Sequence, residues 1–154
     1  MNLMQHPSML RDVAAGFVAA ALAVLIFHQG MLFLIAQAGW TKGAAWSLTA
    51  MPPYGVPRLV NAMFWGGLWG CLFGAIADRL PGRSYLIKGF VFGLVFTTIL
   101  GSWLLVSLIK GRPLFGGFLQ GYDLTKLRNG FLLNSVAFGI GLGFLFALMR
   151  RGKP

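Results

Sequence analysis

His28 is the residue of this sequence most suited to chemistry, because it is the one ionisable side chain deep inside a long apolar block. An ionisable group within a membrane span is by default a candidate for function. Gln29 follows it directly and adds a second polar side chain. Three roles suit this pair: a proton relay, a cofactor ligand or a contact to a polar substrate. The alternative is a neutral imidazole that is hydrogen-bonded to a neighbouring helix.

Asn61 and Asn134 occupy early positions in two other apolar blocks. An asparagine can form a hydrogen bond across helices, worth roughly 0.6–2 kcal/mol in a membrane. The pair therefore suits either the joining of helices or the lining of a polar vestibule. Together with His28 and Gln29, these residues form the candidate polar site of the sequence.

The acidic residues add little chemistry. They are Asp12, Asp78 and Asp123, and all three fall at predicted helix ends. A carboxylate-driven proton or cation carrier usually has a carboxylate at mid-membrane depth, so proton-coupled transport loses support. His6, the only other histidine, precedes the first apolar block, which disfavours a bis-histidine haem. No Cys/His spacing suits zinc. We expect no catalytic residues, no cofactor, no metal and no enzymatic activity.

Four long apolar blocks must position these side chains. The chain is 57% apolar and 10% charged, whereas about 25% of residues are charged in an ordinary soluble domain. About 20 apolar residues are needed for a helix to cross the hydrocarbon, and lipid offers backbone groups no partner outside a helix. We predict an all-α membrane protein that forms a single membrane domain over residues 1–154. Its four transmembrane helices are predicted at about 13–39, 59–77, 85–109 and 130–149.

The net charge of +10 comes from basic residues in short stretches that flank the apolar blocks. This arrangement suits anionic lipid headgroups as partners. No stretch forms a basic face with interleaved aromatic residues, so we expect no nucleic acid as a partner. With the N-terminus inside, seven basic residues face the cytoplasm and six face the other side. The positive-inside rule then favours both termini in the cytoplasm.

The two halves of the chain match at one constant offset of 73 residues. Gly16-Phe17-Val18 aligns with Gly89-Phe90-Val91, and Leu72-Phe73 aligns with Leu145-Phe146. Each half crosses the membrane twice, so the halves would form a parallel repeat about an axis along the membrane normal. The alternative is chance similarity among helices rich in Gly and Phe. We predict two duplicated hairpins, over residues 11–78 and 84–151.

Small residues recur every four positions along one face of the second and fourth predicted helices. Small residues at this spacing let helix backbones approach closely in lipid. We expect these two helices to cross closely on their small faces; self-association of protomers through one such face is the alternative. The predicted packing residues are Gly66, Gly70, Gly74, Gly139, Gly143 and Ala147.

Residues at the helix ends give further expectations. Ser84 is predicted to cap the third helix, and Asp123 is predicted to cap the fourth. Trp40 and Trp46 suit the belt of aromatic residues at a membrane interface.

Three motifs in the first half of the chain carry a resemblance: Phe27-His28-Gln29-Gly30, the run from Met51 to Pro57, and Phe64-Trp65-Gly66-Gly67-Leu68-Trp69-Gly70. They resemble a group of small uncharacterised four-helix inner-membrane proteins of proteobacteria. The resemblance implies a multi-pass protein of the bacterial inner membrane, and no activity is attached to the group.

Function follows only in outline from these patterns. The abundance of small-residue faces favours a non-enzymatic structural or accessory subunit that self-associates or joins a larger membrane complex. The alternative is a small transporter or channel whose path is lined by the candidate polar site. That alternative requires the four polar side chains to converge on one cavity.

Overall fold

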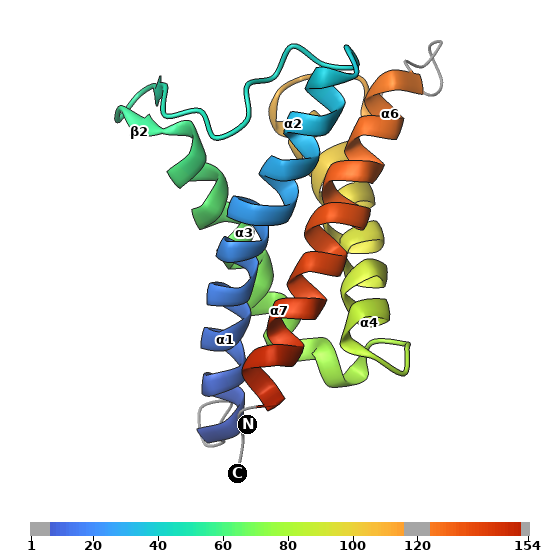
Figure 1. Ribbon diagram of the computed structural model, residues 1–154. Helices are drawn as coiled ribbons and strands as arrows, with labels where there is room; N and C mark the ends of the chain where they lie inside the picture. Colours follow the sequence, from blue (N-terminus) through green and yellow to red (C-terminus); the bar gives the residue numbers. More distant parts are fainter. Residues whose placement is uncertain (1–6, 116–123, 152–154) are drawn as a thin grey trace.

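The computed structural model describes residues 7–115 and 124–151 of the chain. Within this part, four helices are long and apolar enough to cross a membrane: Met9–Gln37, Arg58–Arg79, Tyr85–Ile109 and Leu124–Arg150. The predicted four-helix membrane fold is therefore confirmed. Figure 1 shows the first helix beginning and the last helix ending at the same end of the bundle, which we call the terminal end. The opposite end is called the loop end.

The first two spans are joined by a loop with a short hairpin. The first span consists of α1 (Pro7–Ala23), the π-helical segment η1 (Val24–His28) and α2 (Gln29–Gln37). Two short strands, β1 (Ala50–Met51) and β2 (Val56–Pro57), pair antiparallel in the loop. The second span consists of α3 (Arg58–Ile76) and one 3-10 turn, η2 (Ala77–Arg79).

The third and fourth spans also contain π-helical segments. The third consists of α4 (Tyr85–Phe92), η3 (Gly93–Leu105) and α5 (Val106–Ile109). The fourth consists of α6 (Leu124–Gly130), η5 (Phe131–Gly139) and α7 (Ile140–Arg151). It begins at Leu124, ahead of the apolar block at about 130–149, because the polar residues of α6 continue the helix beyond that block. The predicted cap of α4 is confirmed, since the Ser84 hydroxyl accepts the Ile87 N–H at 3.4 Å. Asp123 lies outside the described residues.

Glycines bring the first and second spans into backbone contact. A methyl group on Gly16 would overlap the backbone of Gly70, and one on Gly74 would overlap the backbone of Asp12. Without such methyl groups, α1 and α3 approach more closely than side chains would permit, and close packing is what holds helices together in lipid.

The third and fourth spans meet in a similar way. A methyl group on Gly89 of α4 would overlap the backbone of Gly139 and Gly143. The expected crossing of the second and fourth spans on these faces is therefore wrong. Each small face packs on the span that precedes it in the chain, because a spacing of four residues defines a small face but not the neighbour that it meets.

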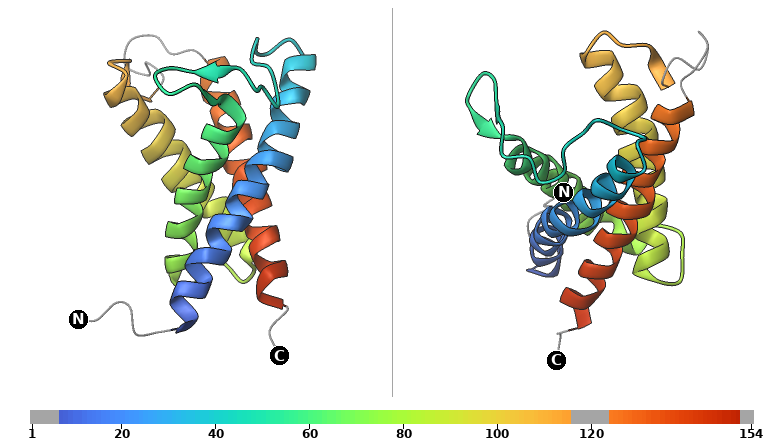
Figure 2. Two further views of the ribbon diagram at one scale, coloured as in Figure 1. Left: turned by 90° about the vertical axis from the view of Figure 1, so that its left-hand side faces the viewer. Right: turned by 45° about the horizontal axis from the view of Figure 1, so that its top comes forward.

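The core of the bundle is aromatic and joins α3, α4 and α7. Phe73, Phe92 and Phe146 are fully buried. The ring centroid of Phe73 lies 5.3 Å from that of Phe92 and 5.2 Å from that of Phe146, and both pairs meet edge to face. This arrangement brings a ring edge to a ring face, which suits the aromatic quadrupole. Figure 2 shows that the spans diverge from one another towards the loop end.

A buried polar contact also joins the third and fourth spans. The hydroxyls of Thr98 in η3 and Ser135 in η5 lie 2.8 Å apart, and both residues are fully buried. Thr98 also contacts the carbonyl of Gly93, at 2.8 Å. Polar side chains that satisfy one another in this way stabilise helix pairs in lipid.

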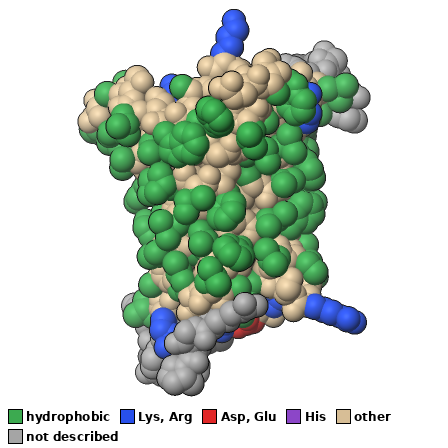
Figure 3. Space-filling view, viewed as in Figure 1, with side chains coloured by type: hydrophobic (Ala, Val, Ile, Leu, Met, Phe, Trp, Pro, Cys, Tyr) green, Lys and Arg blue, Asp and Glu red, His purple; other side chains and the backbone are tan. Residues whose placement is uncertain are grey.

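The surface is divided into bands. In the view of Figure 3, hydrophobic side chains cover the middle of the molecule, and Lys and Arg gather at its two ends. This pattern fits a hydrocarbon core bounded by two polar interfaces.

Candidate functional site

Gln29 of the candidate polar site anchors the loop between the first two spans. Its side chain is buried, with 5% of the residue exposed. Its Oε1 accepts the backbone N–H of Trp46 at 2.8 Å, and its Nε2 lies 3.5 Å from Nδ1 of the half-buried His28. Gln29 therefore holds the loop that follows the first span, and His28 lies beside it.

Trp46 completes this anchor with its indole ring. The indole N–H donates to the backbone carbonyl of Leu25 at 2.8 Å. Leu25 lies in η1, where the wider π turn interrupts the regular α-helical hydrogen-bond pattern. Trp46 adopts a left-handed backbone conformation with a φ of 51°, which costs a non-glycine residue roughly 1–2 kcal/mol. Two hydrogen bonds and the ring of Phe33, 6.1 Å away between centroids, offset that cost.

We expect Gln29→Leu to release the loop without unfolding the bundle. The substitution leaves the Trp46 N–H without its acceptor, a loss of about 1–2 kcal/mol in loop docking. Hydrogen exchange followed by mass spectrometry is expected to accelerate at residues 41–48. Gln37→Leu is the matched control, because Gln37 lies exposed on the same helix. Equal protection of the loop in both variants would contradict the anchoring role.

The two asparagines lie in different surroundings. The Asn61 side chain accepts the indole N–H of Trp65 at 3.2 Å, and its Nδ2 lies 3.9 Å from Sδ of Met51. Asn134 contributes its backbone carbonyl to the hydroxyl of Thr97 at 3.4 Å. Asn61 thus makes its contacts at the loop end of α3, whereas Asn134 lies where the third and fourth spans meet.

Two cavities in the described part of the chain lie away from these four residues. One cavity, of about 380 Å³, is apolar and lies between the first and fourth spans, beside Phe27, Gly30 and Gly141. A second, of about 580 Å³, lies at the terminal end between α4 and α7. None of the four predicted site residues lines either cavity. A transport path through these residues therefore gains no support from either cavity.

The structure instead gathers polar side chains from all four spans around Arg150. The guanidinium contacts the carboxylate of Asp12 at 3.1 Å and that of Asp78 at 2.8 Å. It also donates to the hydroxyl of Tyr85, which in turn donates to Asp78 at 3.0 Å. These four residues, which we call the Arg150 cluster, come from α1, η2, α4 and α7. A single cation therefore ties together the terminal ends of all four spans.

The Arg150 cluster is partly shielded from water. The Arg150 side chain is 20% exposed and that of Asp12 is 12% exposed, whereas that of Asp78 is 66% exposed. Deleting one partner of an ion pair that is shielded from water costs more stability than deleting one partner of an exposed pair. Sequence reasoning placed these residues at helix ends but did not bring them together. The signal that could have found them is that all four fall at the same end of an even-numbered bundle.

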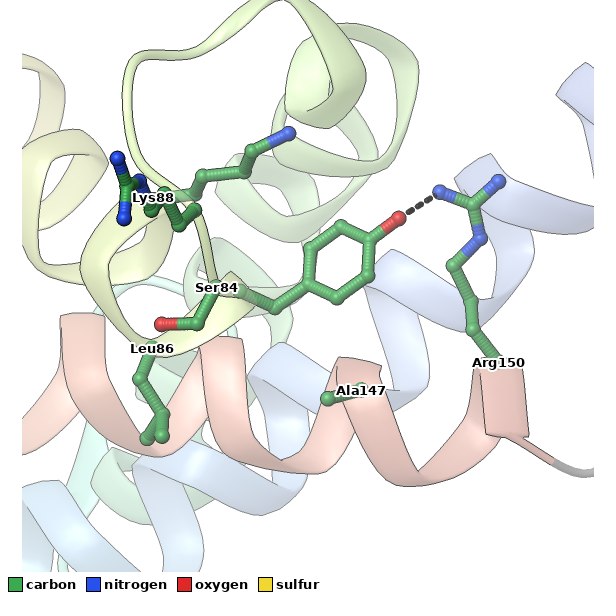
Figure 4. A pocket seen from close by; sticks show the side chains of 7 residues that line it. Ser84, Leu86, Lys88, Ala147 and Arg150 are labelled. Atoms are coloured by element: carbon green, nitrogen blue, oxygen red, sulfur yellow. Dashed lines mark hydrogen bonds between the residues drawn. The ribbon is translucent and has the colours of Figure 1, made fainter.

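Tyr85 lies between two cations at the edge of this cluster. The ammonium of Lys88 and the guanidinium of Arg150 each lie 5.4 Å from the centroid of its ring. Figure 4 shows Lys88 and Arg150 reaching this region from α4 and α7. Cations at this distance are attracted by the face of an aromatic ring. The Tyr85 ring therefore helps to hold positive charge at the terminal end.

Comparisons with known proteins add no further constraint on this site. No family model, no curated protein and no solved structure matches the chain.

Proposed function

We propose that the chain is a non-enzymatic membrane subunit that associates with a further copy of itself, or with a larger membrane complex, through the outward face of α3. The observation that carries this proposal is the position of α3. It has the lowest mean hydropathy of the four spans, and it is also the least buried. In its most apolar stretch 22% of the residues are buried, compared with 33–44% in the other three spans. The side of α3 that faces away from α1 is therefore the most extensive uncovered surface among the four spans.

The outward face of α3 has the composition of a protein contact. Phe64 and Trp65 are 50% and 57% exposed, and Leu68 and Leu72 follow on the same side. Aromatic residues are enriched in protein–protein interfaces. The polar groups noted in the sequence support a structural role as well, since Gln29 holds a loop and Asn61 holds the Trp65 indole.

The glycine faces are not available for this association. Gly70 and Gly74 are in contact with α1, and Gly143 is in contact with α4. The α3 face that remains outward is therefore the side chain surface around Leu68, rather than the small-residue face.

The single cysteine allows a direct test, because Cys71 lies on α3 and is half-buried. We expect oxidative cross-linking in native membranes to give a homodimer through Cys71, and we expect Leu68→Trp to abolish it. Leu34→Trp is the matched control, since Leu34 is also an exposed leucine of a membrane span, on α2, at 61% exposed against 41% for Leu68. If the detergent-purified particle is strictly monomeric, without partners and without cross-linking at Cys71, the proposal fails. A stable complex with a different membrane protein, lost in Leu68→Trp, would support the second form of the proposal.

We further propose that the bundle consists of two duplicated hairpins. Supporting this, Gly16 packs on Gly70 and Gly74, and its counterpart Gly89 packs on Gly139 and Gly143, one helical turn displaced. The clearest support comes from the two rings at matching positions, because Phe73 and Phe146 contact each other. Equivalent residues of two repeats meet in this way only close to the axis that relates them.

A difference in side-chain size accounts for the asymmetry between the two halves. Ala19 and Ala23 of the first half correspond to Phe92 and Phe96 of the second, and the first three of these residues are fully buried. Alanines let α1 approach the fourth span, whereas Phe92 fills the space between α4 and α3 with its contacts to Trp69 and Phe73.

For its location, we propose the bacterial inner membrane, with both termini in the cytoplasm. The basic residues that favour this orientation include Arg79, Arg83 and Lys88 in and beside the short turn between the second and third spans. Membership in the proteobacterial inner-membrane group that the sequence resembles stays part of this proposal.

A further inference from the structure

The cavity at the terminal end is lined by three basic side chains and no acidic one. Arg83, Lys88 and Arg150 line a space of about 580 Å³ between the start of α4 and the end of α7. The two carboxylates at this end, those of Asp12 and Asp78, face Arg150 and do not line the cavity. The lining is therefore strongly cationic.

Two of these cations, Arg83 and Lys88, form no direct ion pair with a carboxylate among the described residues. The two acids of the terminal end are engaged by Arg150, and the third acid of the chain lies beyond the described part. The ammonium of Lys88 lies 5.4 Å from the centroid of the Tyr85 ring, and it also interacts electrostatically with the Asp78 carboxylate without forming a direct ion pair. Arg83 is exposed at the rim. The cavity lining therefore carries a net positive charge.

The backbone adds to this potential. Ser84, at the N-cap of α4, also lines the cavity. Its hydroxyl occupies the N–H of Ile87, which leaves other first-turn N–H groups of α4 without a helical acceptor. The N-terminal end of a helix carries about half a positive charge and favours an anion.

The opposite side of the cavity is apolar. Figure 4 shows the charged ends of Lys88 and Arg150 on one side, and Leu86 and Ala147 on the other. Leu86 is 43% exposed and lies on the first turn of a membrane span, so this wall continues into the lipid-facing surface. A ligand that fits both sides is an amphiphile with a negatively charged head.

We propose that this cavity binds the phosphate group of an anionic phospholipid, with Arg83 and Lys88 as its principal contacts. The lipid phosphate lies at the depth where the third and fourth spans meet the interface, and its acyl chain follows Leu86 along the bundle. Basic cavities between membrane helices are suited to such headgroups. A free phosphate ion supplies the same head chemistry, but it makes no use of the apolar wall.

The test is native mass spectrometry of the purified full chain, titrated with dioleoyl phosphatidylglycerol, dioleoyl phosphatidylcholine or inorganic phosphate. We expect the phosphatidylglycerol to bind most tightly. Arg83→Gln combined with Lys88→Gln is expected to weaken that binding about thirtyfold, from about fivefold for each basic side chain. Lys42→Gln combined with Lys110→Gln is the matched control, because both lysines lie exposed at the loop end. The control is expected to bind as the unmodified chain does.

Each contrary result has a definite meaning. Equal affinity for the phosphatidylcholine, or an equal loss in the control pair, would overturn the site. Binding of inorganic phosphate as tight as that of the phosphatidylglycerol would overturn the lipid assignment. Arg150 is left unchanged because it also holds the four spans together. The single variant Lys88→Gln, with an expected loss of about fivefold, decides the question if the double variant does not fold.

Discussion

Gly70→Leu is expected to lower the free energy of unfolding by about 3 kcal/mol or more, the upper range for overpacking a closely packed site. A side chain at this position would overlap the Gly16 carbonyl and the Ala20 methyl group, and the first of these is backbone that cannot rotate away. The two helices must separate along their length, which removes the contact that joins α1 to α3. Unfolding by sodium dodecyl sulfate in mixed micelles, followed by circular dichroism, measures the loss.

Gly30→Leu is the matched control for this substitution. Gly30 lies in α2 of the first span, and no atom lies within 4 Å of the position that its Cβ would occupy. Leu also has a higher helix propensity than Gly, by about 0.8 kcal/mol. We therefore expect this control to unfold at the same or a higher detergent fraction. If Gly70→Leu were as stable as Gly30→Leu, the close backbone contact between α1 and α3 would be refuted.

Arg150→Gln is expected to cost about 2–3 kcal/mol of unfolding free energy. Deleting one partner of a buried ion pair costs about 3–5 kcal/mol, and the partial exposure of Arg150 and the wide exposure of Asp78 reduce that figure. Most of the loss comes from Asp12, whose carboxylate stays in a site that is 12% exposed. The same detergent titration measures it.

Two further variants separate this pairing from a general effect of charge. Arg79→Gln removes an equal charge at the same end, where the side chain donates to the backbone carbonyl of Ala75 and is exposed. We expect it to change stability by less than about 0.5 kcal/mol. Adding Asp12→Asn to Arg150→Gln is expected to restore part of the loss, because the carboxylate that has lost the Arg150 guanidinium is removed as well. Strictly additive effects of the two substitutions would show that Asp12 and Arg150 are not coupled.

The fold was predictable from the sequence because hydrophobic length is a local property. Each apolar block is long enough to cross the hydrocarbon, and no choice of partners changes that result. The Ser84 cap was predictable for the same reason, since the hydroxyl and the N–H that it accepts lie in one turn. The spacing of Gly66, Gly70 and Gly74 defines a face of small residues but gives no information about which helix covers it.

The contacts of the polar residues were not predictable, because they depend on the path of the chain between spans. Gln29 meets Trp46 only because that tryptophan adopts a positive φ, which its residue type does not suggest. Asp12 and Arg150 lie near opposite ends of the sequence, so their pairing follows from the arrangement of four helices rather than from any local pattern. The π-helical turn that contains Leu25 likewise has no signature in the spacing of apolar residues.

The position of Arg150 constrains the order in which the protein assembles. Within each half, the tight backbone contacts join consecutive spans, so each hairpin can form as soon as its second span is synthesised. Arg150 lies in the last turn of the fourth span, and its partners lie on the other three. Until translation reaches that turn, Asp12 and Asp78 lack the Arg150 guanidinium. The contacts that join the terminal ends of all four spans can therefore form only after the last turn of the fourth span has been synthesised.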